Sequence, residues 1–223
     1  MNRLILIFAL FFLSSCISTP SVTYKPRIGE KYVPATQYVT ASWYGSKFHG
    51  RPTASGERYN MFGLTAAHKT MKFGTKLRVT YPETGGSVVV TVNDRGPFIR
   101  GRDLDLSYGA AKAIGLEVKG VGRVRIEYLG RDMRYLKRIP FAPQKGSGHL
   151  TIQVGSFTER SNASRLKRGL KIQYKNVDIT NVFLQGEKYY RVRVGRFKDY
   201  ESAYSVAEKL AGEGYRVLIT DRN

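Results

Sequence analysis

Short apolar runs separated by glycine-containing polar turns dominate residues 38–130. Apolar and β-branched side chains concentrate in four runs, at 39–44, 77–81, 87–92 and 122–129. Runs of this length predict β-strands, and several of them at this spacing predict a small barrel or sandwich. An alanine-rich stretch before Gly115 predicts one helix, with Asp105 or Ser107 accepting N–H groups at its start.

A repeat organises the last third of the chain. Residues 152–157 recur as residues 192–197, and the alanine and leucine at 163 and 170 recur at 203 and 210. Each copy predicts a strand, a glycine turn and a helix. A Gln-Gly-Glu stretch at 185–187 signals a hairpin between a strand at 177–184 and the strand at 188–194 that leads into the second copy, and a last strand is predicted at 216–220. The resulting order βαββαβ predicts one four-stranded sheet with both helices on one face.

Alternation along the repeated strands predicts the character of the uncovered sheet face. Because the isoleucine and valines of these strands must face the helices, Gln153, Arg191 and Arg193 point away from them. Phe157 and Phe197 stand at the strand ends. Arginines and aromatic rings on an open sheet suit a polymer that carries carboxylates and sugar rings. A plain solvated face is the alternative.

The N-terminus carries the pattern of an export signal. A basic start and a wholly apolar stretch at 4–13 precede Cys16, the only cysteine. The residues before it resemble the bacterial lipobox, which implies cleavage after residue 15 and a lipid on Cys16, and Ile17 after it favours the outer membrane. The alternative is an ordinary signal peptide with an incidental cysteine. Residues 16–37, with three prolines and no periodicity, predict a tether.

The charge of the chain predicts a polyanionic partner. Lys and Arg number 37 against 17 Asp and Glu, a formal net charge of +20. Export removes nucleic acid as a partner, and leaves anionic lipid, lipopolysaccharide or the carboxylates of peptidoglycan. Solubility alone explains part of the charge.

The candidate chemistry centres on residues 88–98. A β-branched run stops at once in a polar cluster closed by Gly-Pro, which predicts a buried strand that delivers Asn93, Asp94 and Arg95 to its rim. Asp94 is an acid/base candidate there, although an aspartate at this position also serves as a turn cap. For Asp103 and Asp105, we favour a capping or turn role over catalysis.

Five stretches, one of them within residues 88–98, form a recognisable set of motifs. They are Ala-Ser-Trp-Tyr-Gly at 41–45, Thr-Ala-Ser-Gly-Glu at 53–57, Thr-Ala-Ala-His at 65–68, Val-Asn-Asp-Arg-Gly-Pro-Phe at 92–98 and Asp-Leu-Ser at 105–107. In this order they resemble the rare lipoprotein A family. The resemblance implies a six-stranded double-psi β-barrel, and the C-terminal repeat resembles the SPOR domain that accompanies it, except that Arg196 stands where proline is usual.

This resemblance implies a lytic transglycosylase of peptide-free glycan, with Glu57, His68 and Asp94 as its catalytic residues. Asp94 is expected to act as acid and base, Glu57 to position substrate or stabilise the transition state, and His68 to orient Asp94 or bind the sugar. No cofactor and no metal is expected. Substrate binding is expected at ten further residues: Trp43, Tyr44, Arg95, Gln153, Ser156, Phe157, Tyr190, Arg191, Arg193 and Phe197.

An acid role for Asp94 requires a raised pKa. Burial or a second carboxylate raises the pKa of a carboxyl group, whereas the cations Arg95 and His68 would lower it. Neighbours in extended chain point apart, so Arg95 is expected to face away from Asp94. Glu57 close to Asp94 is expected to raise one pKa of the pair.

The sequence thus predicts an outer-membrane lipoprotein of a Gram-negative envelope, facing the periplasm, that cleaves denuded glycan with 1,6-anhydro ends and is brought to division septa by its SPOR domain. Amidase or divisome partners are left open. The alternative is a non-catalytic, expansin-like peptidoglycan binder. The predicted segments are a signal peptide (1–15), the lipidated cysteine and tether (16–37), the barrel (38–130), a linker (131–147) and the SPOR domain (148–222).

Overall fold

The computed structural model describes residues 36–140 and 149–222. The predicted signal peptide, Cys16, nearly all of the predicted tether and residues 141–148 lie outside the described residues. Among the helices that are described, none has the length and apolar character needed to cross a membrane.

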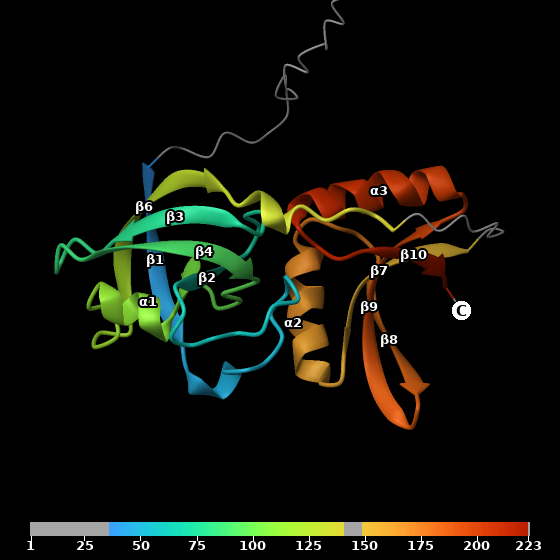
Figure 1. The fold of residues 1–223 in the computed structure, drawn as a ribbon, viewed down its shortest axis with the longest axis horizontal. Helices are drawn as coiled ribbons and strands as arrows, with labels where there is room; N and C mark the ends of the chain where they lie inside the picture. The colour runs from blue at the N-terminus through green and yellow to red at the C-terminus, as the bar shows by residue number, and fades with distance from the viewer. Residues whose placement is uncertain (1–35, 141–148, 223) are drawn as a thin grey trace, which may run out of the picture. The chain divides into compact units, whose positions relative to one another are not determined.

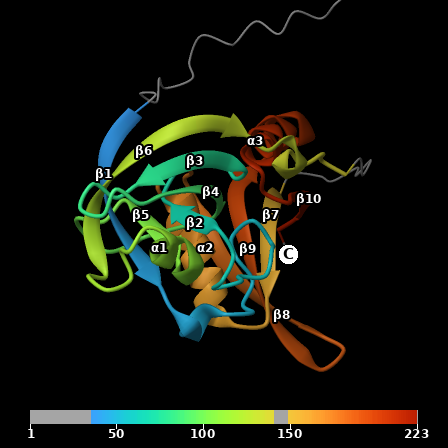
Figure 2. The same ribbon diagram turned by 60° about the vertical axis from the view of Figure 1, so that its left-hand side comes forward.

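The first described domain is a closed six-stranded barrel (Figures 1 and 2). Its strands are β1 (Thr36–Tyr44), β2 (Thr65–His68), β3 (Thr75–Thr80), β4 (Ser87–Asp94), β5 (Leu104–Ser107) and β6 (Val121–Arg131). They follow one another round the barrel as β1-β5-β2-β4-β3-β6, and β6 closes it by pairing with β1. The pairs β1/β5 and β2/β4 are parallel. The predicted double-psi β-barrel is therefore confirmed.

Strands β2 and β5 are the two that the hydrophobic pattern missed. Each has only four residues, too few for an alternating run to stand out from a turn. In the barrel, β2 lies between β5 and β4. Ala67 of β2 is in register with Asp94 of β4 on one side and with Asp105 of β5 on the other. The two short strands therefore bring two aspartates to neighbouring positions at one end of the barrel.

The barrel is filled by aliphatic side chains, with one short helix beside it. Leu77, Val90 and Leu106 are among its fully buried residues. Helix α1 (Tyr108–Ala113) begins at Ser107, whose Oγ accepts the N–H of Ala110 at 3.2 Å and donates to the carbonyl of Gly63. Ser107 is thus the cap of α1, and Asp105 belongs to β5 instead.

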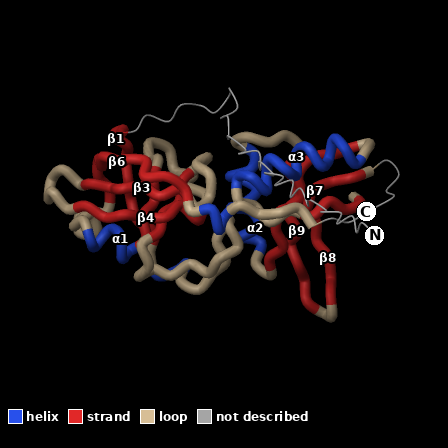
Figure 3. The backbone as a smooth tube through the Cα atoms, turned by 45° about the horizontal axis from the view of Figure 1, so that its top comes forward, coloured by secondary structure: helices blue, strands red, loops and turns tan. Residues whose placement is uncertain are grey.

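The second domain is a four-stranded sheet with the strand order β10-β7-β9-β8 (Figure 1), and Figure 3 labels its strands β7, β9 and β8. Its elements are β7 (Leu150–Phe157), α2 (Arg160–Lys171), β8 (Val177–Leu184), β9 (Glu187–Phe197), α3 (Tyr200–Glu213) and β10 (Leu218–Asp221). Gln185 and Gly186 both have positive φ, as a two-residue hairpin turn requires. The predicted βαββαβ order is confirmed, with both helices packed on the same core.

Two short 3₁₀ helices complete the described elements: η1 (Ser46–Phe48) in the loop after β1, and η2 (Met133–Tyr135) after β6. Tyr135 and Phe73 come from the barrel side of the chain but belong to the hydrophobic core of the second domain. The backbone N–H of Phe73 donates to the carbonyl of Glu213 at 2.9 Å, and Nη1 of Arg131 donates to that of Gly212 at 2.7 Å. Two main-chain carbonyls at the end of α3 therefore accept hydrogen bonds from the barrel side of the chain.

Three aromatic residues expected at the open sheet face pack wholly or partly against the core of the domain. Phe157 is only 8% exposed and belongs to the core beneath the helices, because a register shift near Gly155 turns this strand end inward. Tyr190 and Phe197 also pack partly against that core. Phe157 thus does not offer an aromatic face to a sugar in this structure.

Replacing Ser107 by alanine should lower the free energy of unfolding by about 1–3 kcal/mol, since α1 loses its cap and the partly buried carbonyl of Gly63 loses its donor. Urea titration followed by the fluorescence of Trp43, the only tryptophan, measures the change. Ser87→Ala is the control, because its hydroxyl shares one exposed hydrogen bond with Thr80. A loss as small as that of the control would contradict the capping role.

Candidate active site

A cavity of about 220 Å³ opens where β2 and β4 end and β5 begins. Two carboxylates, Asp94 and Asp105, face it together with the aromatic residues Tyr44 and Phe48. The remaining lining residues are Ala67, Arg95, Gly96, Pro97, Phe98, Ile99, Arg165 and Arg168. The last two belong to α2, so both domains contribute to the cavity wall.

Asp94 is held at the end of β4 by main-chain donors. Its side chain is buried, with 2% exposure, and its Oδ1 accepts the N–H of Ala54 at 2.9 Å and that of Arg95 at 2.8 Å. The other oxygen, Oδ2, lies 3.5 Å from Nη1 of Arg165. Main-chain N–H groups therefore hold Oδ1, whereas Oδ2 faces the guanidinium of Arg165.

Burial raises the pKa of Asp94 above its ordinary value of 3.8, against the opposing effect of Arg165 and of the two N–H donors. The direction is the one that an acid catalyst requires, because a carboxyl group removed from water keeps its proton to higher pH. The expected source of this shift was partly different, since burial and not a neighbouring Glu57 is its leading cause.

Asp105 is the second carboxylate of the cavity, in place of the capping or turn role expected for it. It accepts a short hydrogen bond from the hydroxyl of Ser42, and burial raises its pKa. The charges of both Asp94 and Asp105 contribute to the raised pKa of Tyr44, after the larger effect of burial. The Asp-Leu-Ser motif contained the signal for this residue, but only the pairing of β5 with β2 brings it to Asp94.

Stacked aromatic rings form one side of the cavity. The ring of Tyr44 stacks on that of Tyr59 with centroids 4.2 Å apart, and Phe48 meets Tyr44 edge-on at 6.2 Å. The hydroxyl of Tyr59 donates to the carbonyl of Tyr44 at 2.8 Å. Trp43, the neighbour of Tyr44, packs instead against the barrel core and the edge of Tyr108. Tyr44 is therefore the aromatic residue of this motif that lines the cavity.

The side chain of Arg95 is directed to groups other than Asp94, as alternation predicted, and its burial separates it from solvent; of its nitrogens, the buried Nη2 has no hydrogen-bond partner among the described residues. It is 1% exposed, and its guanidinium lies 3.8 Å from the ring centroid of Phe73. Nε donates to the hydroxyl of Tyr215 at 2.6 Å, and Nη1 donates to the carbonyl of Met71 at 2.9 Å. These contacts make Arg95 a structural link between the domains.

His68 supports that link. Its Nδ1 accepts the N–H groups of Thr70 and Met71 at 3.1 and 3.0 Å, which orders the turn that holds Arg95. Burial, aided by the charge of Arg95, lowers the pKa of His68 to about 4. The imidazole is therefore neutral at neutral pH, with its proton on Nε2.

Glu57 lies beside Asn93 and not among the cavity residues. Nδ2 of Asn93 donates to its Oε2 at 2.7 Å. Because Asn93 and Asp94 are consecutive residues of β4, their side chains leave the strand on opposite sides. Glu57 and Asp94 are thus joined through the strand end and the Thr-Ala-Ser-Gly-Glu loop, whose Ala54 donates to Asp94.

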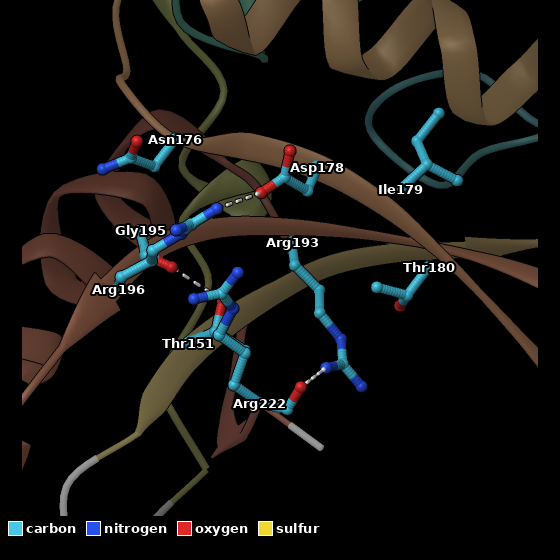
Figure 4. Close-up of a pocket in the computed structure, with 9 residues that line it drawn as sticks. All are labelled: Thr151, Asn176, Asp178, Ile179, Thr180, Arg193, Gly195, Arg196 and Arg222. Carbon is cyan, nitrogen blue, oxygen red and sulfur yellow. Dashed lines mark hydrogen bonds and ion pairs between the residues drawn. The ribbon is translucent and has the colours of Figure 1, made fainter.

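A second cavity, of about 290 Å³, lies on the open sheet face (Figure 4). Nη1 of Arg193 donates to the carbonyl of Arg222 at 3.0 Å, and Arg196 lies 3.7 Å from Asp178. The other lining residues are Thr151, Asn176, Ile179, Thr180 and Gly195. Strand register places two of the predicted residues beside the arginines, with Gln153 opposite Arg193 and Ser156 opposite Arg191. Sequence reasoning did not name the β8 and C-terminal residues of this cavity, although it predicted the hairpin that pairs β8 with the strand of the arginines.

No group of three or more His, Cys, Asp or Glu side chains suited to a metal occurs within residues 36–140 and 149–222.

Comparison with known families assigns both domains. A family model described as lytic transglycolase matches residues 36–126, and one described as SPOR domain matches residues 146–220. Both matches agree with the two folds described above.

Several relatives carry the name endolytic peptidoglycan transglycosylase RlpA. The protein of that name from Neisseria meningitidis is 36% identical over 200 residues, which cover 86% of this chain and 80% of the relative. That from Vibrio cholerae is 37% identical over 182 residues, covering 81% and 66%. A Synechocystis relative, named as a probable member, is 60% identical over 87 residues, or 39% of this chain. This chain spans only 27% of the Synechocystis protein's length.

The raised pKa of Asp94 predicts how stability depends on pH. The folded protein binds this proton more tightly than the unfolded chain, so stability is lost as pH rises from 3.8 through the folded pKa. The Asp94→Asn variant has no group that ionises at this position. We therefore expect the wild type to become less stable relative to Asp94→Asn as pH rises above 3.8, measured by urea titration at a series of pH values. A wild type that gains relative stability over this range would contradict the buried-acid description.

Proposed function

Because the chain belongs to the rare lipoprotein A (RlpA) family, we propose that it is an endolytic peptidoglycan transglycosylase. Its substrate is the β-1,4 bond between N-acetylmuramic acid and N-acetylglucosamine in peptide-free glycan strands. The observation that supports this most directly is Asp94, a buried carboxyl group with a raised pKa at the wall of a cavity that also holds Asp105 and Tyr44.

In the proposed reaction, Asp94 first donates a proton and later accepts one. Asp94 in its acid form protonates the leaving glycosidic oxygen as the bond from C1 of muramic acid breaks. The C6 hydroxyl of the same sugar then forms the new bond to C1 and returns its proton to Asp94, which yields the 1,6-anhydro end. Asp105 is the carboxylate nearest in register, and its negative charge stabilises the positive charge that develops on the ring.

The remaining motif residues position this pair. Glu57 acts through Asn93 on the end of β4, and neutral His68 acts through the turn that holds Arg95. Tyr44 offers its ring and Phe48 an adjacent edge to the sugar.

The open face of the second domain binds peptidoglycan glycan in this proposal, through Arg191, Arg193, Gln153 and Ser156. Arg191 and Arg193 are close enough for the charge of one to help lower the pKa of the other, after burial. Such a pair favours a ligand that brings carboxylates. A lipid on Cys16, outer-membrane anchoring and enrichment at septa complete the proposal.

Incubating the mature protein with amidase-treated sacculi should release anhydromuramyl products, identified by mass spectrometry. Asp94→Asn should lower the rate by about 10²–10⁴, the usual contribution of a general acid, and Asp105→Asn should lower it less. Glu83→Gln is the control, because Glu83 pairs with Lys119 at an exposed site. Full activity of Asp94→Asn would disprove its role, and the absence of product from wild type would favour a non-catalytic, expansin-like binder.

Arg191→Ala should weaken binding to denuded glycan about tenfold, since a charged hydrogen-bond donor is lost from the open face. Sedimentation with amidase-treated sacculi measures this. Lys209→Ala removes a cation from the helix side of the domain and should bind as the wild type does. Equal losses in both variants would point to net charge and not to the open face.

A further inference from the structure

Asp94 has a partner that opposes its acid role. Nη1 of Arg165 lies 3.5 Å from its Oδ2, and the arginine side chain is itself only 16% exposed. A cation at this distance favours the ionised carboxylate, which has no proton to give to a leaving oxygen. For the proposed reaction to begin, Arg165 needs another anion to pair with.

Arg165 does not stand alone in this wall. Its guanidinium lies 4.6 Å from the ring centroid of Phe48. The guanidinium of Arg168, one turn further along α2, lies 4.9 Å from the ring centroid of Phe98. Two guanidinium groups on one helix thus face a cavity that contains carboxylates and aromatic rings.

The helix that carries them is fixed against the barrel at both ends. Near its start, Glu159 pairs with Arg51 at 3.0 Å. Near its end, a Cβ added at Gly169 would lie 2.9 Å from Cβ of Arg95, so only glycine permits this approach. The cavity wall formed by α2 is therefore a built part of the site.

The proposed substrate brings an anion of the right kind. Muramic acid carries a lactyl ether on the ring whose C1 bond is to be broken. When the stem peptide has been removed this group ends in a carboxylate, and when the peptide is present it ends in a neutral amide. A guanidinium binds a carboxylate through two parallel hydrogen bonds and distinguishes it from an amide.

Building on the proposed function, we propose that Arg165 is the receptor for the lactyl carboxylate of peptide-free muramic acid, and that this carboxylate takes Arg165 from Asp94. Asp94 then takes a proton from solvent and becomes the acid. A peptide-bearing strand offers no such anion, so Arg165 stays on Asp94. Selectivity for peptide-free glycan then resides in the catalytic cavity, through a side chain of the second domain.

The test compares peptide-free strands with the same strands after methyl esterification of their lactyl carboxylates. Wild type should show kcat/KM about tenfold to a hundredfold higher on the free acid, the scale of a charged hydrogen-bonded pair. Arg165→Gln should lose most of this ratio through a lower kcat/KM on the free acid alone. Lys171→Ala, an exposed cation at the end of the same helix, should keep the wild-type ratio.

Each other outcome overturns the proposal. If Arg165→Gln cleaved both strands faster than the wild type, Arg165 would only inhibit Asp94. If kcat/KM fell equally on both strands, the role of Arg165 would be structural. An unchanged ratio would remove it from recognition.

A binding measurement keeps the inference testable if no strand is cleaved, a result that would refute the proposed function by itself. Asp94→Asn should bind the free-acid disaccharide of N-acetylglucosamine and N-acetylmuramic acid more tightly than its methyl ester, by calorimetry. Adding Arg165→Gln should abolish this difference, and a difference that persists would overturn the assignment.

Discussion

The burial of one guanidinium governs the arrangement of this molecule. Arg95 follows directly after Asp94, and its charged group is enclosed by Phe73, Tyr215 and the carbonyl of Met71. A buried guanidinium is tolerated only where hydrogen-bond acceptors and aromatic faces compensate its charge, so these partners must come together whenever the protein folds. Since Tyr215 belongs to the second domain, the same contact that completes the strand end also brings α2 to the cavity.

The electrostatics of Asp94 follow from this packing. Enclosing the strand end removes water from the carboxyl group and raises its pKa, while the helix brought in by the same packing presents Arg165, which lowers it. Burial is the larger effect. A carboxyl group set between these two influences can change protonation when its cation finds another partner, which a group governed by burial alone cannot do.

The two domains are therefore not a separate catalytic domain and a separate binding domain, because both contribute side chains to the cavity. The open face of the four-stranded sheet carries arginines for a polymer, while the opposite, helical side supplies α2 to the barrel. In the proposed function, this one small domain therefore contacts glycan at two surfaces. A double-sided use of this kind depends on the helices covering only one face of the sheet.

By itself the sequence determined the βαββαβ fold, because the internal repeat and the hairpin at Gln185 and Gly186 are local signals. For the first domain, alternation indicated only four strands of a barrel or sandwich, and the double-psi barrel followed from the resemblance of its motifs to a family. It also identified Asp94, since a β-branched run that ends in a polar turn is visible in one stretch of chain. Only the tertiary structure decided which side chains meet Asp94. Strands β2 and β5 are too short to be read from alternation, so Asp105 was taken for a cap, and Glu57 was expected where Arg165 lies. Phe157 was expected in solvent because a register shift within a strand leaves no trace in the residue pattern.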